Sequence, residues 1–207
     1  MSDRPLVILI GGATGTGKST VATKVAYELG ITRLTSTDSI RQTLRAFFSH
    51  EFMPTIHHSS FSAGEALPDS DDPLVAGFLE QSRNVLVGVQ ASIDRALQEG
   101  WSIIFEGVHL VPGLLPALSG RALVCPFVIS IEDETEHAQH FFSRNEGSER
   151  PLTNYLDHFG EIRRLQTFIV ERAEREGVPV IENVNPELTS GELIDIVMSA
   201  ARRVEAL

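Results

Sequence analysis

A glycine-rich stretch at residues 12–19 sets strict limits on the fold of this chain. Its sequence, GATGTGKS, fits the pattern G-x-x-x-x-G-K-[ST]; an apolar run at 6–10 precedes it and a predicted helix over 18–29 follows it. The glycines let the backbone curl so that its N–H groups point inward at a phosphate, and the start of the helix adds partial positive charge. An ordinary strand–turn–helix is the alternative. The apolar strand and the helix around the pattern favour a phosphate-binding loop (Walker A motif, or P-loop).

The same loop predicts how ATP and Mg²⁺ would be bound. Lys18 supplies a positive charge to the β- and γ-phosphates, and the Ser19 hydroxyl is a ligand for Mg²⁺. Asn185 follows the last predicted strand, where adenine is expected to lie, although turns also favour asparagine. The expected ATP-binding residues are Gly12, Ala13, Thr14, Gly15, Thr16, Gly17, Lys18, Ser19, Thr20 and Asn185.

The rest of the chain alternates between predicted strands and helices. Strands are expected over 31–35, 101–105, 122–131 (interrupted by Pro126) and 178–181, and helices over about 38–48, 73–98, 132–142, 155–176 and 192–204. Such alternation predicts an α/β fold, here a P-loop three-layer sandwich with a five-stranded parallel sheet. Ligands of these sheets bind beyond the carboxyl ends of the strands. We expect a single domain over residues 1–207.

Composition narrows the classes of partner and the compartment. The chain has 207 residues, a formal net charge of -11 and only two lysines, Lys18 and Lys24. Such an acidic surface argues against nucleic-acid and anionic-membrane partners. With so few lysines, binding of the expected partner, a small-molecule anionic acceptor, must rest on arginine, which suits recognition of phosphate and carboxylate. Cys125 is the only cysteine, so no intrachain disulfide can form, and its apolar surroundings predict a buried, inert thiol. The apolar run at 6–10 is too short for a signal peptide or membrane helix, which predicts a cytoplasmic protein. A monomer or a homodimer is expected.

Two acids follow predicted strands and are candidates for the chemistry. Asp38 lies in STDSIR after the second strand, where a carboxylate can hold an acceptor hydroxyl or take its proton. The alternative is that Asp38 or a neighbouring hydroxyl caps the next helix. Glu106 ends the third strand and can hold a magnesium-bound water or activate the acceptor. A capping or solvated carboxylate beyond the strand is the alternative. Both are predicted catalytic residues together with Lys18, and Glu106 is a predicted metal ligand together with Ser19.

A segment at about 38–72 is the predicted acceptor-binding region. Its stretch over 50–72 is irregular, and loops of that length in compact domains are usually functional or mobile. Arginine suits bidentate recognition of anionic groups, and the histidines and serine can contact anions or hydroxyls. Ordinary loop polarity and packing are the alternatives for the histidines. The predicted acceptor-binding residues are Asp38, Arg41, Arg45, His57, His58, Ser59 and His109.

A small lid is predicted at about 143–151. Arg144 and Arg150 bracket the polar sequence NEGSE and can stabilise charge on the moving phosphoryl group while closure excludes water. The alternative is a solvated loop with local ion pairs.

Several blocks in order along the chain resemble the 2-phosphoglycerate kinase family. They are the phosphate loop at 10–20, STDSIR at 36–41, HSSF at 58–61, FEGVHLVPG at 105–113 and GVPVIEN at 177–183. The resemblance implies a fold of the nucleoside-monophosphate-kinase type with a lid, and transfer of the γ-phosphate of ATP to 2-phosphoglycerate, giving 2,3-bisphosphoglycerate. It also implies that residues 12–20 bind ATP while Asp38, Arg41 and Glu106 serve acceptor and magnesium.

The residues themselves leave other functions open. A kinase for another small metabolite would use the same loop and acids. A nucleic-acid end kinase would need a basic track, which the acidic composition does not offer. A nucleotide-dependent switch without phosphotransfer would explain the loop and give Asp38 and Glu106 no task.

Overall fold

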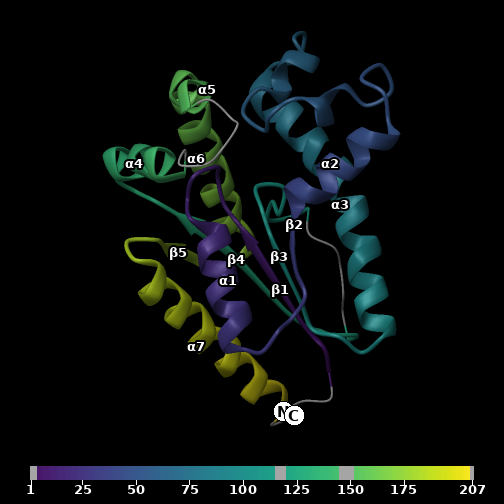
Figure 1. Ribbon diagram of the computed structural model, residues 1–207, viewed down its shortest axis with the longest axis vertical. Coiled ribbons are helices and arrows are strands. Elements are labelled where there is room, and N and C mark those ends of the chain that lie inside the picture. Colours follow the sequence, from purple (N-terminus) through teal and green to yellow (C-terminus); the bar gives the residue numbers. More distant parts are fainter. Residues whose placement is uncertain (1–3, 115–119, 145–151, 206–207) are drawn as a thin grey trace.

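The computed structural model describes residues 4–114, 120–144 and 152–205. Its elements alternate along the chain much as the sequence predicts, and Figure 1 shows the sheet between its helices. They are β1 (Leu6–Gly11), α1 (Lys18–Glu28), β2 (Leu34–Ser36), α2 (Thr37–Phe47), the 3₁₀ turns η1 (Pro54–His57) and η2 (Ala63–Ala66), α3 (Pro73–Gln98), β3 (Ile103–Glu106), β4 (Leu123–Ser130), α4 (Glu134–Arg144), α5 (Leu152–Asp157), α6 (Phe159–Glu176), β5 (Val180–Glu182) and α7 (Pro186–Glu205).

The five strands found in these ranges form one parallel sheet in the order β2-β3-β1-β4-β5. β1 lies in the middle, paired with β3 on one side and β4 on the other. A strand with neighbours on both edges and helices on both faces must be apolar throughout, which explains the uninterrupted run at 6–10. The P-loop fold class predicted from the sequence is therefore present, with the phosphate loop leaving the central strand.

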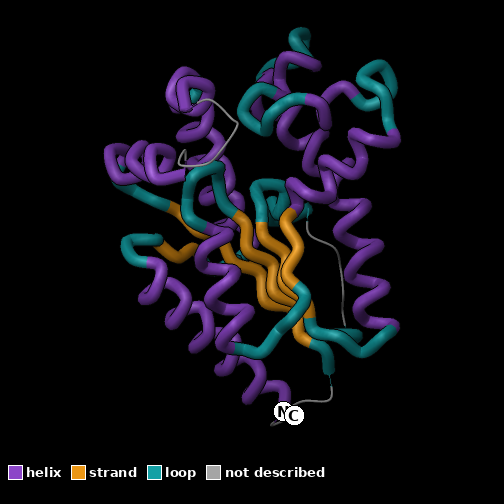
Figure 2. Tube along the Cα trace, in the orientation of Figure 1, coloured by secondary structure: helices purple, strands orange, loops and turns teal. Residues whose placement is uncertain are grey.

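Alternate residues of β1 point into two separate hydrophobic layers. Ile8 and Ile10 pack against α1 and α7, whereas Val7 and Leu9 pack against α3. On that second face, the part of the sheet near β4 and β5 is covered by α6. Figure 2 shows the strands enclosed between these helices, which is the expected three-layer sandwich.

Some element boundaries differ from the sequence prediction. β4 runs through Pro126 without interruption. The amide of Val128 points toward the β5 side, so the nitrogen of Pro126, two residues earlier, points the same way. Since β5 pairs only with residues 128–130, no strand lies opposite the Pro126 nitrogen on that side. The missing N–H therefore costs no ladder hydrogen bond. The helix predicted over 155–176 is divided at His158 into α5 and α6.

Residues 50–72 are irregular, as predicted, with η1 and η2 as short turns beside α2 and α3 (Figure 1). The segment lies directly on α3, because a Cβ at Gly77 would collide with the backbone of Ala63.

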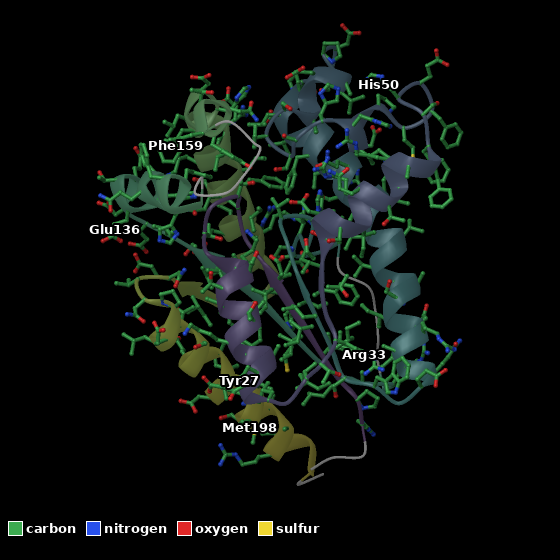
Figure 3. The ribbon with its side chains drawn as sticks, viewed as in Figure 1. Tyr27, Arg33, His50, Glu136, Phe159 and Met198 are labelled. Carbon is green, nitrogen blue, oxygen red and sulfur yellow. The ribbon has the colours of Figure 1, made fainter. Side chains whose placement is uncertain are left out.

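Two sequence predictions concern features away from the sheet edge. Cys125 is buried, and burial raises the pKa of its thiol to about 11, which keeps the thiol protonated and unreactive. Within the described ranges, every helix is too short or too polar to cross a bilayer. Figure 3 shows the side chains that cover the molecule, with Tyr27 and Met198 among the exposed apolar ones.

Candidate functional site

The phosphate loop takes the predicted curled shape. Gly12, Gly15 and Gly17 have φ angles of 136°, 88° and 82°, which side-chain-bearing residues rarely adopt, and Gly17 is the residue before α1. The loop backbone therefore curls in front of the helix start, where amide groups and the helix dipole favour an anion.

Lys18 folds back onto the loop. Its Nζ donates to the carbonyl of Ala13 at 2.5 Å and lies 3.5 Å from the hydroxyl of Thr16, and the residue is 8% exposed. The ammonium group is thus held near the centre of the loop, where a bound phosphate would replace the Ala13 carbonyl and the Thr16 hydroxyl as its partner.

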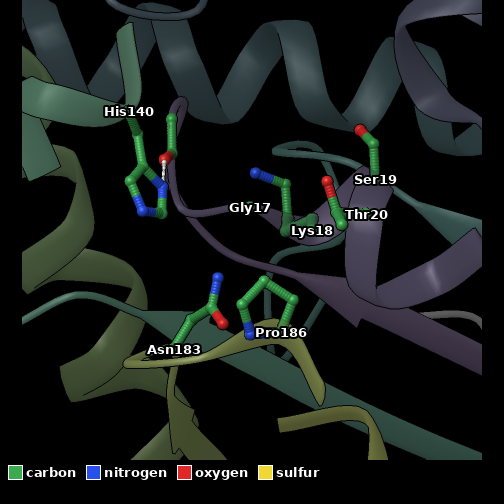
Figure 4. A pocket seen from close by; sticks show the side chains of 8 residues that line it. Gly17, Lys18, Ser19, Thr20, His140, Asn183 and Pro186 are labelled. Atoms are coloured by element: carbon green, nitrogen blue, oxygen red, sulfur yellow. Dashed lines mark hydrogen bonds between the residues drawn. The ribbon is translucent and has the colours of Figure 1, made fainter. Parts of the chain in front are cut away.

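Two histidines of α4 hold the outer side of the loop, and the sequence analysis missed both. His137 Nε2 donates to the Thr14 carbonyl at 2.8 Å, and His140 Nδ1 donates to the Gly15 carbonyl at 2.9 Å. Figure 4 shows the second bond. Burial lowers the pKa of His137 to about 4, so its ring is neutral and keeps one nitrogen as a donor. Their spacing of three residues on a predicted helix was a signal that both side chains share one face.

Asn183 holds the loop from the opposite side. Its Nδ2 donates to the Thr16 carbonyl at 2.9 Å, and a Cβ at Gly17 would collide with the same amide. Asn185 instead accepts from the amides of Glu187 and Leu188 at the start of α7. The turn preference of asparagine therefore accounts for its observed contacts, and ATP binding by Asn185 stays a prediction.

A cavity of about 480 Å³ opens beside the loop. Its walls include Gly15, Thr20, His140, Asn183 and Pro186 (Figure 4). The size and the position next to the phosphate loop suit the base and sugar of a nucleotide.

A second cavity, of about 520 Å³, shares Lys18 and Ser19 with the first and contains both predicted acids. Asp38 reaches it from α2, Glu106 from β3, and Tyr155 from α5. The sheet register explains why the acids meet: Glu106 pairs with Ser36 on one side and Ile10 on the other, so both strands end beside the loop. Sequence reasoning missed Tyr155, which stacks on Phe141 with ring centroids 5.1 Å apart.

Asp38 does not cap α2. The Ser36 hydroxyl accepts the hydrogen bond from the Asp38 amide at 3.1 Å, leaving the Asp38 carboxylate to face the cavity and Arg41 Nε at 3.2 Å. The neighbouring-hydroxyl alternative for the cap is therefore confirmed. Glu106 is 7% exposed, so the alternative of a well-solvated carboxylate is wrong.

The predicted acceptor-binding residues are only partly gathered at this cavity. Arg41 is 4% exposed and donates to the carbonyls of Ile56 and His58, while Arg45 donates to Gln42 Oε1. His57 Nε2 lies 3.0 Å from the Phe48 carbonyl. None of these side chains is among the walls of the second cavity, and neither is Ser59. Their contact with an acceptor stays a prediction.

His109 lies inside the protein, beneath the cavity. It is completely buried between Thr37 and Gln81, and burial lowers the pKa of its imidazole to about 4. Packing, one of the two alternatives drawn from the sequence, describes this position. A neutral buried ring is a poor partner for an anion, and direct acceptor binding by His109 has no support in this geometry.

The predicted lid cannot be placed. Arg144 ends α4, and its side chain, like Arg150 and most of the stretch 143–151, lies outside the described residues.

The oxygen donors around the loop suit magnesium. The hydroxyl of Ser19 and the carboxylates of Asp38 and Glu106 line one cavity, and hard oxygen ligands of this kind are those that Mg²⁺ prefers. Among the described residues, no group of three or more His, Cys, Asp or Glu is placed to hold a metal ion by itself.

The sequence is similar to archaeal proteins named 2-phosphoglycerate kinase. It is 42% identical to the one from Methanothermobacter thermautotrophicus over 197 residues, 41% identical to that from Pyrococcus horikoshii over 196, and 38% identical to that from Methanopyrus kandleri over 202. These alignments cover 92–95% of this chain and 62–64% of the relatives, so the chain spans under two thirds of their length. The resemblance predicted from the sequence is confirmed.

Solved structures agree with the fold. A shikimate kinase from Acinetobacter baumannii superposes with a TM-score of 0.54 at 15% identity, covering 95% of this chain and 94% of that one. A sugar kinase from Janibacter sp. HTCC2649 also gives 0.54, at 16% identity, with coverages of 96% and 95%. At such identities the likeness establishes the P-loop kinase fold alone. No family model matches the chain.

Proposed function

We propose that this protein is an ATP-dependent kinase that transfers the γ-phosphate to 2-phosphoglycerate, giving 2,3-bisphosphoglycerate. One observation carries the reaction type: Lys18 and Ser19 of the phosphate loop share a cavity with Asp38 and Glu106. The acceptor is taken from the names of the relatives, which match nearly the whole chain.

In this proposal ATP lies across the phosphate loop. Its base and sugar occupy the first cavity, between His140 and Pro186, and its phosphates face the loop amides and Lys18. The bonds from His137, His140 and Asn183 to loop carbonyls hold the loop in shape before ATP arrives. A loop held in this way loses little freedom on binding.

The acceptor occupies the second cavity. Asp38 is the better candidate to orient its hydroxyl and take the proton, because its carboxylate lines the cavity and is held there by Arg41. Ser19 and Glu106 are the proposed residues that would hold Mg²⁺, which when bound would neutralise negative charge on the phosphates of ATP. Residues 38–72 are proposed as the acceptor-binding part of one domain, and 143–151, with Arg144 and Arg150, as the lid.

The second cavity explains why the alternatives are less favoured. A nucleotide switch needs a phosphate loop but no second polar cavity with two carboxylates beside it. The phosphates of a nucleic-acid end would be repelled by a chain of net charge -11.

The test is an acceptor screen with ATP and Mg²⁺, measured as ADP release and as phosphorylated product. We expect 2-phosphoglycerate to raise ADP release well above the basal rate, with 3-phosphoglycerate, glycerate, shikimate and gluconate as comparison acceptors. No stimulation by any acceptor would leave the nucleotide switch as the better description. Strong stimulation by another acceptor would keep the kinase and overturn the substrate.

Two variants test the assigned roles. Lys18→Ala is expected to abolish acceptor-dependent ADP release, because the transferring group loses its nearest positive charge. Asp38→Asn keeps the size of the side chain and removes the base, so turnover should fall by about 10²–10⁴-fold while ATP still binds. Full activity in Asp38→Asn would remove that carboxylate from the chemistry and leave Glu106 as the candidate.

A further inference from the structure

A group of buried polar side chains lies under the second cavity, outside the phosphate loop. His109 is 0% exposed, with Nδ1 2.8 Å from the Thr37 hydroxyl and Nε2 3.0 Å from Gln81 Oε1. Gln81, also 0% exposed, donates from Nε2 to the carbonyls of Thr55 at 2.5 Å and His58 at 3.0 Å. Buried polar groups of this kind are held in place only when every partner is present.

The partners fix the direction of each hydrogen bond. Since Gln81 Nε2 faces two carbonyls, its Oε1 must be the acceptor toward His109, and His109 Nε2 must carry the proton. The Nδ1 of a neutral imidazole then has only a lone pair, so the Thr37 hydroxyl donates to it. The bonds thus run in one direction, from Thr37 through His109 and Gln81 to the backbone of the turn η1.

Arg41 reaches the same turn from α2. Its Nη1 donates to the carbonyls of Ile56 at 3.0 Å and His58 at 2.9 Å, so the His58 carbonyl accepts from both Arg41 and Gln81. Three carbonyls of this segment, those of residues 55, 56 and 58, therefore accept hydrogen bonds from side chains of two helices, α2 and α3.

Both ends of this group adjoin residues that line the second cavity. Thr37 precedes Asp38, and His109 follows the stretch from Glu106 to Val108 that lines the cavity. A Cβ at Gly107 would collide with the Thr37 hydroxyl, so these two chain segments are in close contact. At the other end, two residues after His58, the Ser60 hydroxyl lies 3.4 Å from that of Thr14 in the phosphate loop.

We propose that Thr37, His109, Gln81 and Arg41 form a positioning relay, which fixes residues 54–60 relative to Asp38 and Glu106 and thereby sets acceptor affinity without touching the acceptor. The inference rests on the proposed function, because it presumes that the second cavity receives the acceptor. It assigns His109 and Arg41, predicted from the sequence as acceptor ligands, to a task inside the protein. It also adds Gln81, which no sequence motif indicated.

The first test uses Thr37, whose hydroxyl can be removed without changing the shape of the side chain. Thr37→Val deletes the donor to His109, and Thr37→Ser keeps it. We expect Thr37→Val to raise the KM for 2-phosphoglycerate at least tenfold and the KM for ATP less than twofold, with Thr37→Ser close to wild type. A purely structural role would raise both KM values together, and that result would overturn the relay.

The second test uses Gln81→Glu, which has nearly the same volume but lacks the amide donors to the two carbonyls. The expected kinetic change is the same rise in acceptor KM. Gln98→Glu, at an exposed position near the end of the same helix, makes the same chemical change away from the relay and should leave both KM values within twofold. Equal KM values for Gln81→Glu and Gln98→Glu would refute the inference.

Hydrogen–deuterium exchange separates failure of the relay from failure of the proposed function. Amides over 54–60 should exchange at least tenfold faster in Thr37→Val and Gln81→Glu than in wild type, whatever acceptor the enzyme uses. If wild type phosphorylates no acceptor, the proposed function fails, and the exchange rates then show separately whether these side chains fix residues 54–60; unchanged exchange would refute the relay as well. If 2-phosphoglycerate is a substrate but exchange over 54–60 is unchanged, or faster exchange leaves the acceptor KM unchanged, the relay is refuted.

Discussion

Mild acid should destabilise this fold through two buried histidines. His109 and His137 are both completely buried, and for each of them burial is the largest cause that lowers the pKa from 6.5 to about 4. Around His109, Arg41 and Lys18 lower the pKa further, whereas Asp38 opposes them. Around His137, the positive charge of Arg163 acts in the same direction as burial. Each ring is therefore held neutral in the folded protein.

The size and sign of the effect follow from proton linkage. Above pH 6.5 both rings are neutral in the folded and the unfolded state, so they contribute no pH dependence. As the pH falls from 6.5 to about 4, these histidines bind protons in the unfolded chain but not in the folded protein. The free energy of unfolding therefore falls by about 1.4 kcal/mol per pH unit for each ring. Over that interval each histidine contributes a loss of about 3 kcal/mol. Together they remove about 6 kcal/mol, a large part of the 5–15 kcal/mol typical of folded domains.

The assay is urea unfolding at pH steps from 7.5 to 4, for wild type and His137→Gln. The glutamine amide can still donate to the Thr14 carbonyl but cannot titrate, so the variant should lose about 3 kcal/mol less than wild type over this range. His50→Gln, at an exposed ring, is the matched control and should follow wild type. Parallel curves for wild type and His137→Gln would refute the reasoning, as would an NMR titration in which the His137 ring protonates near pH 6.5.

Two further predictions concern the phosphate loop. Gly15→Ala places a Cβ 2.5 Å from Phe141 Cζ at a φ of 88°, and the resulting strain of about 1–3 kcal/mol should weaken ATP binding by roughly 5–150-fold in calorimetry. The control is Gly160→Ala, where a Cβ meets nothing within 4 Å. Equal ATP affinities for the two variants would contradict the strain argument. His140→Phe removes the donor to the Gly15 carbonyl and should weaken ATP binding by about 5–10-fold, the equivalent of one net hydrogen bond. His140→Asn, whose amide can replace Nδ1, should recover most of that loss, and failure to do so would show that the ring acts in another way.

The fold class, and the residues that meet at the centre of the candidate site, could be predicted from the sequence alone. The apolar run at 6–10 predicts a strand because β1 is buried on both faces. The glycine pattern predicts the loop because its positive φ angles are conformations that glycine adopts far more readily than other residues. Asp38 and Glu106 could be paired because parallel strands bring their carboxyl ends to one edge of a sheet. Strand boundaries could not be predicted in the same way, since the ends of a short strand such as β2 are set by its pairing with a neighbour.

The tertiary structure decided which polar side chains face the ligand cavities and which face the protein. Arg41 and His109 follow the same motifs as the two acids, yet they point into the interior, toward carbonyls and side chains brought there by α3 and η1. The bond from His137 to Thr14 spans 123 residues of sequence, and no local pattern can specify a partner at that distance. Whether a polar residue binds a ligand or supports its neighbours depends on burial and on long-range partners, and both exist only once the chain has folded.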